Sequence, residues 1–332
     1  MQEVKRESVA WAARTLAWIE GHLYDVVSGW TPIPLADPGK PARIGHFGDQ
    51  FDSVSVAPEG DLVALVAGPG TKGLLLDPLG FVEREVNRSY YQAEAYRYPL
   101  ALFTLPDGQT GVVHCPHDYN RLEIEVAATG ECLTVAEREP DDFFHSRLAV
   151  SSSGRYLLSA GWIWQPFDCL AVYDLHRALD EPGTLDDTSG GVVDLERFHS
   201  ADISGACFVG DDLVVSSADE PSDPGEPGNL GKGSLARYSM EERRFTWQVR
   251  LPEPAGDLIP LGEHVLAVHK HPRLYDAANG DLLAEWPDLP TGDAITSIVW
   301  AETFAGPARV AVDGTRFAHT DGERVTVVDL QA

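Results

Sequence analysis

Histidine and aspartate side chains are the groups in this sequence best suited to chemistry. The 332-residue chain contains 11 histidines and 52 acidic residues. Imidazole and carboxylate groups together are good ligands for divalent cations, which can activate water for hydrolysis or lyase chemistry. His145, Asp142 and His199 are the strongest candidate ligands, because each falls next to the expected start of a strand. They make a metal-dependent hydrolase or lyase one hypothesis, although acidic residues are so frequent that such neighbours also arise without any function.

Two glycine-rich segments resemble cofactor-binding motifs in sequence, but the residues around them do not fit such motifs. Residues 68–73, GPGTKG, match a dinucleotide-binding loop, but such a loop must open a helix and the apolar run LLLDP follows here. Residues 228–234, GNLGKGS, lack the spacing of a phosphate loop, and Gly233 stands where a serine or threonine would hold magnesium. No G-x-S-x-G nucleophile elbow is present in the sequence. We therefore expect no cofactor, apart from the metal of the first hypothesis.

Aromatic side chains give a second signal, which points to protein recognition. Tryptophan, tyrosine and arginine are the residues that most often anchor protein interfaces. Two loop segments are rich in them, and the candidate partner-binding residues are Trp162, Trp164, Phe167, Tyr90, Tyr91, Tyr96 and Arg97. Because Trp162 and Trp164 alternate, core packing at the end of a strand is the favoured explanation for these two, and it is an equal alternative for the tyrosines.

The formal net charge of −27 excludes two classes of partner. Such a charge repels the phosphates of nucleic acids and the surface of an anionic membrane. It favours instead a protein partner with a basic patch, bound in a salt-sensitive way.

Several features of the sequence bear on the compartment. No stretch is long and apolar enough to span a membrane, and charged residues such as Glu3 and Arg6 interrupt the apolar core that a signal peptide needs. The four cysteines are widely spaced, which favours reduced thiols over disulfides or zinc. We therefore expect a cytoplasmic protein, and twenty arginines against five lysines indicate a GC-rich bacterial genome. The sequence leaves the oligomeric state open.

A repeated strand pattern must position these side chains. Residues 146–175 contain an apolar run, a Ser-Gly turn, a second apolar run, a loop and a third apolar run, which is typical of an antiparallel meander. The pattern returns at residues 54–78, 257–286 and 316–330. Self-similarity with a period of about 40 to 50 residues and four strands per unit predicts an all-β fold, a β-propeller of four-stranded antiparallel blades.

Apolar runs in this chain repeatedly end in aspartate. The aspartates are Asp25, Asp77, Asp174, Asp276 and Asp329. We expect each to close the third strand of a unit and to cap the turn that follows. Two wide gaps between them hold one further unit each, so the chain forms seven blades in a single domain. Their approximate ranges are 1–40, 51–87, 96–139, 141–198, 199–251, 254–289 and 293–332.

The start of the chain allows two interpretations. Residues 9–21 fit an amphipathic helix, but the run Leu23-Tyr24-Asp25 favours strands across residues 1–20 as well. The last unit lacks a clear fourth strand after Leu330. We therefore expect an amino-terminal segment to pair with the carboxyl-terminal one and close the ring, which removes free sheet edges.

The segments SSSGRYLLSAG (151–161) and AVYDL (171–175) resemble WD repeats and related bacterial propeller repeats, and the resemblance extends over nearly the whole chain. It implies a toroid of seven blades around a channel, and usually a binding platform.

Loops between second and third strands, and links between blades, emerge on one face of such a toroid, and both aromatic segments fall there. A rigid scaffold that gathers long loops on one side normally uses them for recognition. The favoured hypothesis is a non-catalytic adaptor or accessory subunit of a bacterial multi-protein complex. A metal-dependent propeller hydrolase or lyase, with its His/Asp site at the mouth of the channel, is the alternative, and a purely structural or sensor domain is the third.

Overall fold

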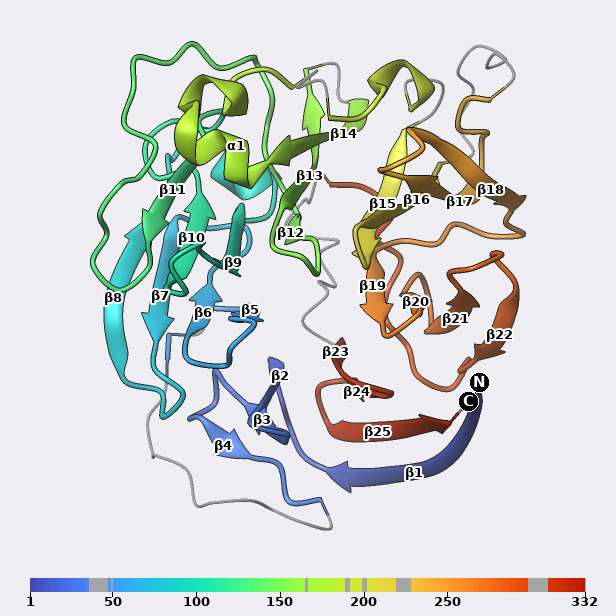
Figure 1. The fold of residues 1–332 in the computed structure, drawn as a ribbon. Coiled ribbons are helices and arrows are strands. Elements are labelled where there is room, and N and C mark those ends of the chain that lie inside the picture. Colours follow the sequence, from blue (N-terminus) through green and yellow to red (C-terminus); the bar gives the residue numbers. More distant parts are fainter. Residues whose placement is uncertain are drawn as a thin grey trace.

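Seven antiparallel sheets stand around a common centre in the computed structural model (Figure 1). The structure describes residues 1–35, 47–48, 50–164, 167–188, 192–198, 202–218, 228–297 and 310–331. The all-β, seven-bladed propeller predicted from the repeats is therefore confirmed. No helix within the described residues is long and apolar enough to cross a membrane.

Each blade is a meander of neighbouring strands. The first contains β2 (Leu16–Ile19), β3 (His22–Asp25) and β4 (Thr31–Pro32); the second contains β5 (Ser53–Val56), β6 (Val63–Val66), β7 (Lys72–Leu76) and β8 (Val82–Asn87). The third contains β9 (Leu100–Thr104), β10 (Thr110–His114) and β11 (Glu123–Val126); the fourth contains β12 (Leu148–Val150), β13 (Tyr156–Ile163) and β14 (Phe167–Asp174). The fifth contains β15 (Ile203–Val209), β16 (Asp212–Ser217), β17 (Ser234–Ser239) and β18 (Arg244–Arg250); the sixth contains β19 (Leu258–Leu261), β20 (His264–Ala267), β21 (Arg273–Asp276) and β22 (Leu282–Glu285).

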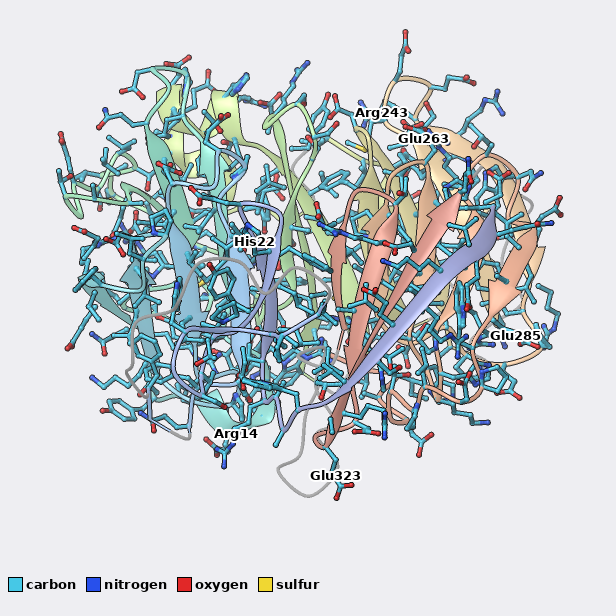
Figure 2. The ribbon with its side chains drawn as sticks, turned by 90° about the horizontal axis from the view of Figure 1, so that it is seen from below. Arg14, His22, Arg243, Glu263, Glu285 and Glu323 are labelled. Atoms are coloured by element: carbon cyan, nitrogen blue, oxygen red, sulfur yellow. The ribbon has the colours of Figure 1, made fainter. Side chains whose placement is uncertain are left out.

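The seventh blade joins the two ends of the chain. It contains β23 (Val310–Asp313), β24 (Arg316–Thr320), β25 (Arg324–Gln331) and, as its outer strand, β1 (Gln2–Ala10). Figure 2 shows β1 lying beside the carboxyl-terminal strands, with which it pairs antiparallel through β25. The predicted closure of the ring is confirmed. The helical interpretation of residues 9–21 is wrong, because the chain there leaves β1 and enters the short strand β2.

The core lies between neighbouring blades, so most strands are buried on both faces. Successive side chains of a strand point to opposite faces of its sheet. On β13, Leu157 packs with Phe103 and Tyr173 against the third blade, while the next residue, Leu158, packs with Phe208 against the fifth. This burial on both faces explains why the predicted strands read as continuous apolar runs.

Aspartates cap the turns after three of the third strands, as predicted. The Asp77 carboxylate accepts hydrogen bonds from the backbone N–H groups of Leu79 and Phe81, at 2.9 and 2.7 Å. Asp276 accepts one from Ala278 at 2.8 Å. Asp174 caps the short helix α1 (Leu175–Asp180). Each carboxylate therefore satisfies backbone donors that a turn leaves without partners.

The prediction for Asp25 is wrong in one respect. This residue ends β3, which is the second strand of its blade, because the first blade begins only at β2. The buried Asp25 carboxylate still meets a backbone N–H, that of Ser28 at 3.4 Å. Asp329 lies within the third strand of its blade, β25, two residues before the end.

Three blades have three strands rather than four within the described residues, namely the first, the third and the fourth. In the third, an isolated bridge between Glu125 and Cys132 follows β11. After β14 of the fourth, the chain continues through α1 and two single turns, η2 (Pro182–Leu185) and η3 (Leu195–Arg197). A third single turn, η1 (Ala93–Ala95), lies in the link from the second to the third blade.

Candidate functional site

Four segments that are far apart in sequence meet around the side chain of Phe144. They are the link 88–99 before β9, the loop 115–122 after β10, the approach to β12, and the end of β13. The backbones of Phe144 and Trp162 form an isolated bridge, with N···O distances of 2.9 and 3.2 Å. Gly161 permits this approach, since a Cβ there would lie 2.0 Å from the carbonyl oxygen of Phe144. The glycine thus brings two aromatic residues into register.

The rings form one connected group, which we call the aromatic cluster: Tyr91, Tyr96, Tyr119, Phe144, Trp162 and Trp164. The Phe144 ring stacks on Trp162 at 4.0 Å between centroids and on Tyr119 at 4.4 Å. Trp164 meets the Phe144 ring edge-on at 5.3 Å. Stacked and edge-to-face pairs of this kind stabilise a cluster beyond the effect of buried area alone.

The cluster has a buried base and an exposed rim. Tyr96, Phe144 and Trp162 are buried, whereas Tyr91 is 46% and Trp164 is 47% exposed. Next to them in the chain, Tyr90 is 80% and Ile163 is 40% exposed. We call these four exposed residues the exposed patch: Tyr90, Tyr91, Ile163 and Trp164. The structure therefore places the predicted Tyr90, Tyr91 and Trp164 at the surface, and Trp162 and Tyr96 beneath it.

Arg88 fixes the link that carries Tyr90 and Tyr91. Its buried guanidinium donates hydrogen bonds of 2.6 to 3.2 Å to five backbone carbonyl groups, those of Gly68, Gly70, Ala93, Tyr96 and Arg97. It also lies 4.4 Å from the ring centroid of Tyr96. Burial lowers the pKa of Arg88. The link is thus tied from within to the loop that follows β6, and the exposed tyrosines extend from a fixed backbone.

Arg97 is buried in an ionic network at the inner ends of three blades. Its Nη1 lies 2.7 Å from Oδ2 of Asp257, and Nη1 of Arg147 lies 3.7 Å from the other oxygen of that carboxylate. The three residues precede the innermost strands of the third, fourth and sixth blades. Burial lowers the pKa of Arg147. This network connects blades that do not share a sheet.

Phe167, the seventh predicted partner-binding residue, begins β14 opposite Ile163 of β13. It is half-buried and lines a groove of about 1070 Å³ together with Ile163. Because Ile163 also belongs to the exposed patch, the groove lies next to that patch.

The candidate metal ligands do not form a cation site within the described residues. His145 is buried, and its two ring nitrogens lie 3.1 Å from Ser159 Oγ and 3.2 Å from the carbonyl oxygen of Asn120. Because a carbonyl only accepts, Nε2 carries the proton and donates to Asn120, and Nδ1 accepts from the serine hydroxyl. Burial lowers the pKa of His145 to about 3, which keeps the ring neutral.

Asp142 is exposed and accepts a hydrogen bond from the Tyr119 hydroxyl at 2.6 Å. Burial and this carboxylate raise the pKa of Tyr119 well above its usual value. His199 lies outside the described residues. Among the residues that the structure describes, no three His, Cys, Asp or Glu side chains are grouped to hold a metal ion.

Sequence reasoning missed the two residues that connect the cluster, Phe144 and Tyr119. Phe144 lies in the segment DDFFHS (141–146), which also contains the candidate ligands Asp142 and His145, and Tyr119 lies in the loop HCPHDYN (114–120). The sequence did contain one indication of this cluster. Phe143 and Phe144 are adjacent, and two large apolar side chains in succession point in different directions, so each needs its own apolar surroundings. Phe143 packs between the third and fourth blades, and Phe144 turns to the aromatic cluster.

Solved structures share the fold at low sequence identity. A chain from the crystal structure of a mitotic checkpoint complex is 11% identical, with a TM-score of 0.58 over 100% of this chain and 96% of that one. BamB from Moraxella catarrhalis is 14% identical, with a TM-score of 0.54 over 99% of both chains. No protein-family model and no curated protein sequence matches the chain. These likenesses agree with the WD-repeat-like propeller predicted from the repeats.

Proposed function

We propose that this protein is a non-catalytic interaction propeller that binds a protein partner through the exposed patch. One observation carries the proposal: four large apolar side chains, those of Tyr90, Tyr91, Ile163 and Trp164, are 40 to 80% exposed on one region of the surface. Isolated exposed apolar residues are normal, but a group of this kind is typical of an interaction site.

The cluster beneath the patch suits it to binding. Trp164 packs edge-on against Phe144 and Trp162, at 5.3 Å in both cases, and Tyr91 lies 5.0 Å from Tyr119. Side chains held in this way lose little conformational freedom when a partner covers them, so more of the contact energy is realised as affinity. Rigid tryptophan and tyrosine side chains with buried support are typical binding hot spots.

Charge defines the kind of partner. The chain carries a net charge of −27, and the exposed residues Glu94, Asp118 and Asp142 lie in the same segments as the aromatic cluster. A partner surface with lysine or arginine around an apolar centre complements this arrangement. Its association should be fast at low salt and slower as ionic strength rises.

More specifically, we propose that the protein is an adaptor or accessory subunit of a bacterial cytoplasmic complex. Arginine-rich composition supports a bacterial source, and four free cysteines suit a reducing compartment. One chain of similar fold was solved as part of a checkpoint complex, which fits an interaction role for the same architecture.

Affinity purification from the native host, followed by binding measurements on the recovered partner, tests the proposal. We expect Trp164→Ala and Tyr91→Ala to weaken binding by about 10- to 100-fold, since hot-spot truncations cost about 1.4 to 3 kcal/mol or more. Leu79→Ala is the matched control: Leu79 is 65% exposed, but it lies in the turn after β7, on the opposite face. Unchanged affinity in folded Trp164→Ala and Tyr91→Ala proteins would refute this surface.

A further inference from the structure

The outer edge of the fourth blade pairs with no strand among the residues that the structure describes. Within the described residues β14 pairs only with β13, along its full length from Phe167 to Asp174. In the second, fifth, sixth and seventh blades a fourth strand covers the corresponding edge. The chain after β14 instead continues through α1, η2 and η3 (Figure 1), and its residues Val193 and Leu195 lie across a groove from β14. An uncovered edge presents a row of backbone N–H and C=O groups that can pair with another strand.

A groove lies along this edge. Its volume is about 1070 Å³, and its apolar lining comes mainly from Phe143, Phe167, Cys169, Leu170, Val193 and Leu195. Phe143 belongs to the core between the third and fourth blades, whereas Leu170 and Val193 belong to the core between the fourth and fifth. The groove therefore straddles the end of the sheet, with side chains of both neighbouring cores as its walls. In the fifth and sixth blades, a fourth strand, β18 or β22, pairs with the corresponding edge of the third strand.

We propose that the groove binds an extended segment of a protein partner, which adds to β14 as the missing fourth strand of the blade. Main-chain hydrogen bonds to β14 give the affinity, and alternate side chains enter the groove to give the specificity. The inference deepens the proposed function, on which it rests, by naming how part of the partner is held. Ile163 lines the groove and also belongs to the exposed patch, so a single partner can contact both.

The fourth strand of the next blade indicates what the segment should look like. In β18, half-buried Phe245, Trp247 and Val249 alternate with exposed residues, and an arginine stands at each end. We therefore expect a segment of about seven or eight residues in which aromatic or aliphatic residues alternate with polar ones.

Charge selects a basic partner rather than a second copy of this chain. Two copies would each carry −27, and bringing them edge to edge opposes that charge. In the groove wall, Asp194 is paired with Arg197 at 3.0 Å, while the exposed Glu196 and Arg243 point toward the surface. The long-range field therefore favours an apolar segment flanked by lysine or arginine.

The probe for the test is a phage-displayed library of linear twelve-residue peptides, panned on the purified full chain. We expect enrichment of sequences with alternating apolar residues and basic flanks. Synthetic versions should bind saturably and slow the hydrogen exchange of backbone amides between residues 167 and 174. Enrichment of no sequence, or protection confined to other strands, would overturn the inference.

Two variants locate the binding. Leu195→Glu places a charge in the groove wall, and Glu196→Lys reverses an exposed charge there without touching the core; we expect each to weaken the selected peptides at least tenfold. Glu263→Lys is the matched control, since Glu263 is exposed in the turn between β19 and β20 (Figure 2). Equal affinity for the Glu196→Lys and Glu263→Lys proteins would contradict a site at β14.

The two proposals fail in different ways. Loss of native-partner binding in Trp164→Ala, with no peptide protecting β14, would leave the proposed function standing and remove the strand addition. Self-association at micromolar concentration that Leu195→Glu abolishes would show a second copy in the groove and overturn the choice of partner. Peptides lost in Trp164→Ala but kept in Leu195→Glu would place the segment on the exposed patch instead.

Discussion

Replacing Arg88 by lysine tests whether the link between the second and third blades is held by the geometry of a guanidinium. Arg88 donates to five carbonyl oxygens, whereas lysine has three donors on one atom. At least two hydrogen bonds are lost, and bonds made by a charged group contribute about 1.5 to 3 kcal/mol each. We therefore expect the free energy of unfolding to fall by about 3 to 6 kcal/mol. For a chain of 332 residues, this lowers Tm by about 4 to 9 °C.

Thermal and urea unfolding measure the loss, and hydrogen exchange shows where it acts. The link 88–99 should exchange faster in Arg88→Lys, because the bonds to Ala93, Tyr96 and Arg97 hold it closed. Arg177→Lys makes the same chemical change at an exposed ion pair in α1 and should alter stability by less than about 0.5 kcal/mol. If Arg88→Lys is as stable as Arg177→Lys, the guanidinium does not hold the link in the way described.

Two further predictions concern the core beneath the surface. Phe144→Ala should cost about 3 to 5 kcal/mol of unfolding free energy, because a buried ring stacked on Trp162 is removed; a loss below about 1 kcal/mol by urea unfolding would mean that the cluster is not packed. Burial lowers the pKa of His145 from 6.5 to about 3, so stability present above pH 6.5 is lost as pH falls toward 3, by up to roughly 4 to 5 kcal/mol. His145→Asn cannot titrate there and should lose less stability between pH 6.5 and pH 4, and parallel curves for the two proteins would contradict this.

The propeller was predictable because its determinants are local. Apolar runs with short turns, repeated along the chain, specify strands that pair with their neighbours in sequence, and Asp77 and Asp276 mark turns by bonding to residues two to four positions away. The exception shows the limit of this reasoning. Asp25 follows the same local pattern, but it ends the second strand of its blade rather than the third. The reason is that β1 pairs with β25 at the other end of the chain, so the first blade begins at β2.

The candidate site was predictable only in outline. Placing Tyr91 and Trp164 on one face followed from the topology of blades, but which side chains are buried depends on contacts between distant segments. Arg97 illustrates this, since its partner Asp257 is 160 residues away. The importance of Phe144 likewise follows from the bridge to Trp162 and from Gly161, which local composition does not indicate.

One departure from the repeat connects the two proposed binding features. β13 and β14 are eight residues each, longer than the four-residue strands β6 and β20, and the extension of β13 carries Ile163 and leads to Trp164 at the surface. The same extension lengthens the open edge of β14, which no fourth strand covers in the described residues. A longer hairpin without an outer strand leaves backbone groups and apolar side chains exposed together. Exposed strand edges and apolar patches favour association, so a partner that covers both is stabilised. The fourth blade is therefore the part of the ring where recognition is most reasonably expected.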